Sequence, residues 1–302
     1  MPTLSHIRAI TLDLDDTLWP VAPTIAGAEQ DLLEWLLVHT PKTAELTQQA
    51  DVKQSIRQSV DHVLCVFPFE TELLARHQIA ATYVGHPLAH KIPQTIDRDA
   101  ARKTLNIPLD AKLVALLPGS RKSEIEYLAL RFLKAAKLMA ACQPGLQFIL
   151  PTMPAFLPAI QSLVQQIGGV PGLQVCEGQS HAALAACDVT LIASGTATLE
   201  AALFKRPMVI AYNMHPLSWQ IMRRKKLQPW VGLPNILLQD FAVPELLQDA
   251  ASPEALADET LQWLDHPSAV RALEARFEVL HNSLKMDTTQ LATDAIEKII
   301  AH

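Results

Sequence analysis

Short apolar runs rich in valine, isoleucine and leucine alternate along this chain with longer stretches that have the apolar spacing of a helix. This alternation is typical of βαβ units, in which helices cover both faces of a parallel sheet. The predicted strands lie at 7–13, 62–67, 81–84, 112–117, 146–150, 173–176, 188–192 and 207–211. The predicted helices lie at 25–38, 51–60, 69–77, 97–105, 121–141, 154–167, 195–204, 243–248, 253–264, 267–281 and 287–301. The sequence therefore predicts an α/β fold with a parallel sheet.

The composition limits the partners and the cellular location that we expect for such a fold. The chain has 302 residues, of which 49% are hydrophobic and 19% charged, as in globular proteins. Its net charge of -6 disfavours a nucleic-acid-binding surface, so we expect no nucleic-acid partner. Asp13, Asp15 and Asp16 interrupt the apolar run that a signal peptide would need, and no run approaches the ~20 apolar residues of a membrane span. We expect a cytoplasmic protein whose four dispersed cysteines are free thiols.

Two predicted strands each run into a turn of small residues and then into a helix, in "VALLPGSRKSEIEY" (114–127) and "VTLIASGTATLEAAL" (189–203). Free backbone N–H groups and the helix dipole favour an anion at such a helix start. Gly119 and Gly195 would let a ligand approach the backbone closely. Because the carboxyl ends of parallel strands meet at one edge of a sheet, the two turns predict one shared anion site.

Side chains at these turns suggest what the anion is. The Arg121 guanidinium can offer two donors to a diphosphate. Glu200 lies about one and a half turns into its helix, where it could reach a sugar hydroxyl. Hydroxyl donors are present at Ser120, Ser194, Thr196 and Thr198. The combination indicates a nucleotide diphosphate-sugar, although serine and threonine at helix starts are also ordinary caps.

Six segments then stand in a fixed order: "VLCVFPFE" (63–70), "VGHPLAH" (84–90), "LLPGSRKSEIE" (116–126), "ASGTATLEAAL" (193–203), "RPMVIAYNM" (206–214) and "LPNILL" (233–238). Their order and spacing are similar to those of the lipid A disaccharide synthases, over about residues 51–301. The resemblance implies a GT-B glycosyltransferase with two Rossmann-like domains, of which the C-terminal one holds the UDP-sugar. It also implies transfer of 2,3-diacylglucosamine from UDP to 2,3-diacylglucosamine 1-phosphate, forming a β-1,6 disaccharide without a metal ion or other cofactor.

The resemblance also assigns roles to individual residues. It places Ser120 and Arg121 at the diphosphate, Ser194, Gly195 and Thr196 in the helix-start cradle, Glu200 at the ribose, and Asn235 near the sugar or phosphates. Glu124 is expected to support Arg121 rather than contact the substrate. No residue is assigned as the catalytic base.

The first residues follow a different pattern. "LDLDDTLW" resembles the first motif of the haloacid dehalogenase-like hydrolases, over about residues 5–45. In that family the first aspartate attacks a phosphoryl group and the second handles the leaving-group proton, with Mg²⁺ present; these roles would fall on Asp13 and Asp15. The later strands carry "LLPGS", "FILPT" and "LIASG" instead of the residues that complete such a site. A Mg²⁺-dependent phosphatase is therefore an alternative that rests on one motif.

These resemblances predict four segments. They are a haloacid dehalogenase-like β-α fragment (1–48), a remnant of a GT-B N-terminal domain (49–92), a UDP-sugar-binding Rossmann-like domain (93–285) and a C-terminal helix (286–302). Only about 60 residues precede "DHVLCVFPFE", where family members carry a longer stretch with the acceptor site and the presumed base. A truncated N-terminal α/β portion is expected, and a UDP-binding or interaction module without turnover is a second alternative.

Two features predict further partners. The segment "MHPLSWQIMRRKKLQPW" (214–230) combines aromatic and basic side chains, among them Trp219, Arg223, Arg224, Lys225 and Lys226. This combination suits an anionic membrane surface, here the inner face of the cytoplasmic membrane, where acylated donor and acceptor would be collected. A solvated basic helix with one buried face is the alternative. The GT-B resemblance implies that the final helix, residues 287–301, packs on the N-terminal domain, so with that domain truncated we expect an exposed apolar patch there and hence a homo-oligomer.

Overall fold

The structure is a computed structural model that describes residues 60–214, 219 and 229–300. The chain divides into two compact units. One comprises Met1–His90, Pro216–Lys226 and Ser283–His302; the other comprises Lys91–His215 and Leu227–Asn282. Outside the described residues lie the predicted strand 7–13, the helix 25–38 and all but the last residue of the helix 51–60. The four predicted segments (1–48, 49–92, 93–285 and 286–302) stay a prediction.

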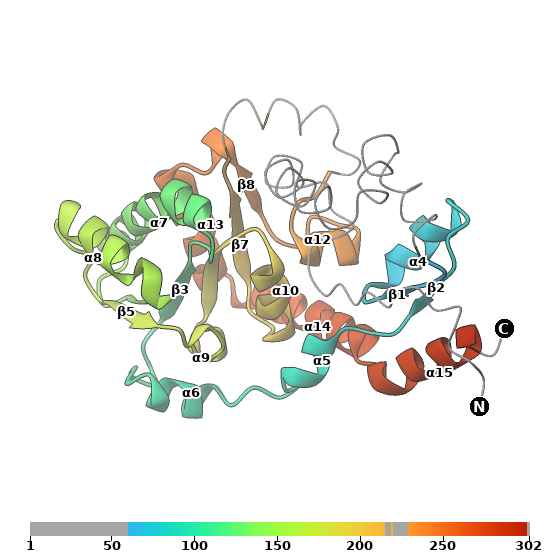
Figure 1. Cartoon of the computed structure of the whole chain (residues 1–302). Coiled ribbons are helices and arrows are strands. Elements are labelled where there is room, and N and C mark those ends of the chain that lie inside the picture. Colours follow the sequence, from blue (N-terminus) through green and yellow to red (C-terminus); the bar gives the residue numbers. More distant parts are fainter. Residues whose placement is uncertain (1–59, 215–218, 220–228, 301–302) are drawn as a thin grey trace. The chain divides into compact units, whose positions relative to one another are not determined.

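The larger unit contains a six-stranded parallel sheet in the order β5-β4-β3-β6-β7-β8 (Figure 1). Its strands are β3 (Leu113–Leu117), β4 (Gln147–Thr152), β5 (Leu173–Glu177), β6 (Val189–Ala193), β7 (Met208–Tyr212) and β8 (Glu245–Leu247). Every residue of β3 and β6 is buried, which explains why their sequences are continuous apolar runs. The chain runs outward from β3 to β5 and returns to β6, so the strand order reverses between β3 and β6.

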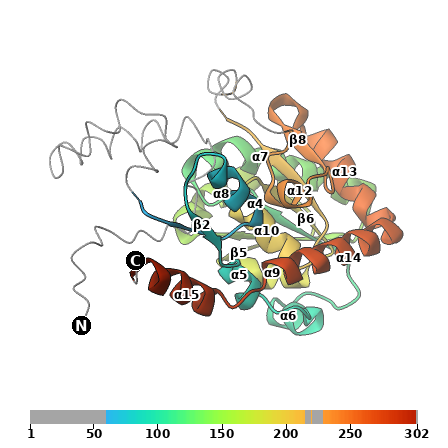
Figure 2. The same ribbon diagram turned by 90° about the vertical axis from the view of Figure 1, so that its right-hand side faces the viewer.

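Helices cover both faces of this sheet (Figure 1). One face packs against α7 (Lys122–Cys142), α8 (Leu157–Gln166) and α13 (Pro253–Asp265), with η1 (Pro154–Phe156) leading into α8. The other packs against α9 (Ser180–Ala186) and α10 (Thr196–Leu203), and α6 (Arg98–Thr104) lies on α9. The view turned by 90° shows α12 (Leu233–Leu238) beside α10 (Figure 2). η2 (Gln248–Ala250) follows β8, and α14 (Pro267–Leu284) follows α13.

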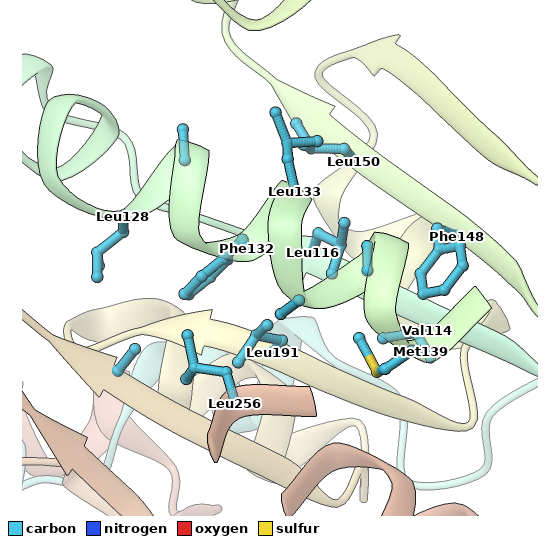
Figure 3. Packing of buried hydrophobic residues seen from close by; sticks show 14 of the residues in the cluster. Val114, Leu116, Leu128, Phe132, Leu133, Met139, Phe148, Leu150, Leu191 and Leu256 are labelled. Atoms are coloured by element: carbon cyan, nitrogen blue, oxygen red, sulfur yellow. The ribbon is translucent and has the colours of Figure 1, made fainter. Parts of the chain in front are cut away.

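The main hydrophobic core lies between α7 and the sheet (Figure 3). Leu128, Phe132 and Met139 of α7 are buried at helical spacing, with Phe132 and Met139 fully so. They meet residues at alternate positions of the strands, such as Leu116 and Phe148. Since fully burying one such side chain contributes about 1.5–3 kcal/mol, this face fixes the sheet from which the strand ends project.

The described residues of the smaller unit form a two-stranded parallel sheet, β1 (Val63–Cys65) with β2 (Ala81–Tyr83). Its helices are α4 (Pro68–Ala75), α5 (Pro87–Lys91, whose last residue falls in the larger unit) and α15 (Thr288–Ile300), which packs on β2. The backbone N–H of His86 donates to the Leu284 carbonyl at 2.9 Å. Its Nδ1 accepts from the Leu88 N–H at 3.2 Å, and its ring lies 5.1 Å from that of Phe67. Burial lowers the pKa of His86 to about 4, so this histidine is neutral at pH 7.

The described strands confirm the predicted parallel α/β arrangement, but one segment that was predicted as a helix is a strand. The helix predicted at 243–248 is wrong, because residues 245–247 form β8 at the edge of the sheet. The predictions did not include α5 and α12, and the helix predicted at 154–167 is divided into η1 and α8. None of the helices in the described part of the chain has the length and apolar character needed to cross a membrane.

Candidate functional site

The candidate site lies at the carboxyl ends of β3, β6 and β7, which are neighbours in the sheet. Open α/β sheets bind ligands outside the carboxyl ends of strands where the strand order reverses, and here that point is between β3 and β6. Both predicted turns follow these two strands, so the structure brings them to the same edge.

The turn after β3 differs from the expectation, because an internal carboxylate fills it. The backbone N–H groups of Ser120 and Arg121 donate to Glu124 Oε2, at 2.8 and 3.2 Å. Gly119 has a φ of +124°, and a Cβ at this position would lie 2.3 Å from the same oxygen. The glycine is therefore needed to admit Glu124, and the first-turn donors expected to hold a ligand anion already hold this carboxylate.

Arg121 is the charged group at this turn. Its Nη1 donates to Glu124 Oε1 at 3.0 Å, which confirms that Glu124 supports Arg121. The Arg121 side chain is 55% exposed, so its guanidinium also faces solvent. Tyr212, at the end of β7, interacts electrostatically with both of these charged side chains. Burial raises the pKa of its hydroxyl, Glu124 raises this pKa further, and Arg121 lowers it.

The turn after β6 is open. Gly195 has a φ of +155°, and a Cβ there would meet no atom within 4 Å. Thr198 closes the first turn of α10 by donating from its N–H and its hydroxyl to the Gly195 carbonyl, at 3.0 and 2.7 Å. Among the described residues, the N–H groups of Thr196 and Ala197 have no hydrogen-bond partner. This helix start therefore offers two free donors and the positive end of a dipole to an anion.

One turn further along α10, Glu200 has a partner that the sequence did not reveal. His181 Nε2 lies 3.2 Å from Glu200 Oε1. The same imidazole packs edge-on against Phe204, with ring centroids 5.3 Å apart. No signal in the sequence identified His181, because it comes from α9, the helix after β5, and only the packing of α9 on α10 brings it here.

Two predicted site residues are engaged in holding the segment ahead of β8. The Ser194 hydroxyl donates to the Val231 carbonyl at 3.0 Å. Asn235 is fully buried; its amide donates to the Val243 carbonyl and to Glu245 Oε1, and its oxygen accepts from the Val243 N–H. Contact of Ser194 and Asn235 with a ligand stays a prediction, and the structure gives both a role in positioning.

Other predicted residues fall largely outside the described chain. Asp13 and Asp15 do, and so do Arg223, Arg224, Lys225 and Lys226 of the membrane prediction; Trp219 is described and half-buried. Within the described residues no three histidine, cysteine, aspartate or glutamate side chains are grouped so as to hold a metal ion. A reaction without a metal stays a prediction.

Comparison with known proteins identifies the family. The sequence model of the lipid-A-disaccharide synthetases matches residues 48–299. The chain belongs to this family. The match does not reach Asp13 and Asp15, and the comparisons lend no support to the hydrolase resemblance at residues 5–45.

Relatives named lipid-A-disaccharide synthase show how much of the family's length is present. The protein from Albidiferax ferrireducens is 61% identical over 251 residues, which cover 82% of this chain and 64% of that protein. The protein from Cupriavidus pinatubonensis is 49% identical over 243 residues, covering 80% of this chain and 60% of that protein. The chain thus spans less than two thirds of the length of these members of the family.

Solved structures with the same fold confirm the predicted class. A glycosyltransferase from Rickettsia africae superimposes with a TM-score of 0.55 at 11% identity, covering 82% of this chain and 66% of that one. Anabaena HepE, solved with UDP and glucose, gives a TM-score of 0.54 at 12% identity, covering 86% and 68%. This family member therefore has the α/β fold of the GT-B glycosyltransferases.

Proposed function

We propose that this chain binds a UDP-sugar at the carboxyl ends of β3 and β6 and acts as a glycosyltransferase of the lipid-A-disaccharide synthase type. The donor would be UDP-2,3-diacylglucosamine and the acceptor 2,3-diacylglucosamine 1-phosphate. Membership of the family and the relatives' names support this reaction. The observation that carries the binding site is the open start of α10, with free N–H groups at Thr196 and Ala197.

The chemistry at this edge suits a departing diphosphate. When the bond from the sugar to UDP breaks, negative charge grows on the diphosphate oxygens. Preorganised donors stabilise such charge without having to reorient, and here the α10 start supplies two N–H groups and the Thr196 hydroxyl. Arg121 would supply the positive charge from the neighbouring turn. These groups would provide the stabilisation that a metal ion gives in other transferases, and we therefore propose a reaction without one.

Calorimetric titration with UDP tests the binding site. We expect the chain to bind UDP and Arg121→Ala to weaken binding about 10-fold or more, because a charged hydrogen-bond partner of the diphosphate is lost. Lys122→Ala is the matched control, since Lys122 is adjacent and its side chain is 82% exposed beside Glu126. Absence of UDP binding by the unaltered chain would refute the proposal.

An assay with both acylated substrates then tests turnover. Disaccharide formation that depends on Arg121 is the expected result. UDP binding without product would instead support the alternative of a binding module. Release of phosphate that needs Mg²⁺ and is abolished by Asp13→Asn would support the phosphatase alternative.

We also propose that residues 214–230 bring the enzyme to the membrane that holds its acylated substrates. The basic residues Arg223 to Lys226 and the aromatic Trp219 support this proposal. Sedimentation with anionic vesicles should fall when the four basic residues are replaced by glutamate, and neutral vesicles should bind weakly in both cases. Equal binding to both vesicle types would contradict it. We propose self-association because the final helix, residues 287–301, would lack the N-terminal surface on which it packs in GT-B proteins; light scattering tests this, and a monodisperse monomer at high concentration would count against it.

A further inference from the structure

His181 contacts two residues that lie one turn apart at the end of α10, one within the helix and one at its C-cap. Glu200 and Phe204 lie at positions i and i+4 of the chain and so project from the same face. The imidazole packs against the Phe204 ring at 5.3 Å and faces the Glu200 carboxylate at 3.2 Å. Phe204 is 5% exposed, so it gives the imidazole a fixed surface to pack on.

The last turn of α9 is also tied to a residue just after the C-cap of α10. Arg206, which follows α10, donates from Nε to the Leu184 carbonyl at 2.9 Å and from Nη2 to the Ala185 carbonyl at 2.8 Å. These carbonyls belong to the last turn of α9. Both ends of α9 therefore contact the C-terminal part of α10 or the residues after it, which holds His181 near Glu200.

The contact with His181 involves one of the two oxygens of the Glu200 carboxylate. His181 Nε2 lies 3.2 Å from Oε1 of the carboxylate, within the distance of an ion pair with a protonated imidazole. Among the described residues no group donates to Oε2, and the side chain is 21% exposed. A free glutamate side chain would have to give up considerable rotamer freedom to bind a sugar hydroxyl. The histidine contact removes part of that freedom before the ligand arrives and leaves one oxygen available.

We infer that His181 is a positioning residue that holds the Glu200 carboxylate in the orientation in which it binds a ribose hydroxyl of the UDP-sugar. This inference rests on the proposed function. It predicts that His181 affects recognition of the ribose and has little effect on the rest of the nucleotide. The ribose specificity of this chain would then depend on a contact between two helices that follow different strands.

The test compares UDP with its 2′-deoxy and 3′-deoxy analogues by calorimetry. In the unaltered chain we expect one analogue to bind about 10-fold more weakly than UDP, because its missing hydroxyl leaves a charged acceptor unpaired. Glu200→Ala should remove this discrimination. His181→Phe keeps the packing on Phe204 but has no N–H to donate, and it should reduce the discrimination about 3-fold or more. His181→Gln restores a donor and should return most of it.

Two comparisons separate this role from a general effect on stability. In a Glu200→Ala background, His181→Phe should change nothing further, because both variants remove the same interaction. His266→Phe is the matched control, since His266 is an exposed histidine at the C-cap of α13 whose ring contacts the Gln262 carbonyl of that helix. If the unaltered chain discriminates and His181→Phe discriminates equally well, the inference is wrong and the proposed function stands. If the unaltered chain does not bind UDP, the proposed function fails first.

Discussion

At the scale of single residues, Arg102 shows how a buried charge is made tolerable in this protein. Its side chain is fully buried, yet its nitrogens reach five oxygens. Nη1 donates to the carbonyls of Pro108, Leu109 and Ala111, Nε to that of Ala186, and Nη2 to Asp188. Asp188 also pairs with Arg98 and accepts the Leu113 N–H at 2.8 Å. One guanidinium therefore joins the loop before β3 to the end of α9.

Replacing this arginine should destabilise the larger unit strongly. Arg102→Met leaves four carbonyls and part of a carboxylate without their donor in a buried place, and we expect a loss on the order of 3 kcal/mol in the free energy of unfolding. Denaturant unfolding followed by circular dichroism measures it. Arg271→Met, at an exposed position of α14, is the control and should change the stability by less than about 0.5 kcal/mol. Similar stabilities for the two variants would contradict this account.

His86 makes a prediction about pH. Burial holds its pKa near 4, whereas a histidine in the unfolded chain has a pKa of about 6.5. Between these values the unfolded chain binds a proton that the folded chain does not, so stability falls as the pH decreases from about 6.5 to 4. The full effect is at most about 3 kcal/mol.

His86→Gln isolates this effect. A glutamine does not titrate, and its side-chain oxygen can still accept the Leu88 N–H. The stability of this variant should therefore fall less than that of the unaltered chain over the same pH range. Unfolding curves of both proteins at pH 7, 5.5 and 4.5 provide the measurement, and parallel losses in the two would show that His86 is not responsible.

At the scale of elements, the sequence predicted whatever depends on local apolar patterning. The strands β3 and β6 are recognisable because both of their faces are buried. The segment containing β8 has helix-favouring glutamate and leucine, and it becomes a strand only because β7 pairs with it. The turn at Gly195 was predictable because the sequence has an apolar strand, then a glycine and then a helix. The filling of the Gly119 turn did not, because it depends on where the Glu124 side chain points.

Glu245 illustrates such a contact between elements and carries a prediction. Its carboxylate accepts from the N–H groups of Val231 and Gly232 and from the Asn235 amide, at about 2.9 Å each, and so joins β8 to the start of α12. Glu245→Ala should cost about 2 kcal/mol in unfolding free energy, since three donors lose a charged acceptor. Glu278→Ala, at an exposed position of α14, should have little effect. Thermal unfolding of both variants checks this, and equal melting temperatures would refute it.

At the scale of the whole molecule, the two units have separate hydrophobic cores. The larger unit is built around α7 and its sheet. The smaller has its own cluster of Cys65, Leu74 and Ile79 beside β1. The sheet in the described residues of the smaller unit has two strands and contributes little stability by itself, so we expect this unit to unfold at a lower temperature than the larger one. Differential scanning calorimetry should accordingly resolve two transitions.

UDP should act on only one of these transitions. All residues proposed to bind it belong to the larger unit, and a ligand that binds only the folded state at 100 times its dissociation constant adds about 2.7 kcal/mol. For a unit of this size that corresponds to a rise of roughly 5 to 10 °C in the upper transition, with the lower one unchanged. Arg121→Ala at the same UDP concentration should reduce the rise. A shift of both transitions together would mean that the units unfold cooperatively and that binding in one stabilises the other.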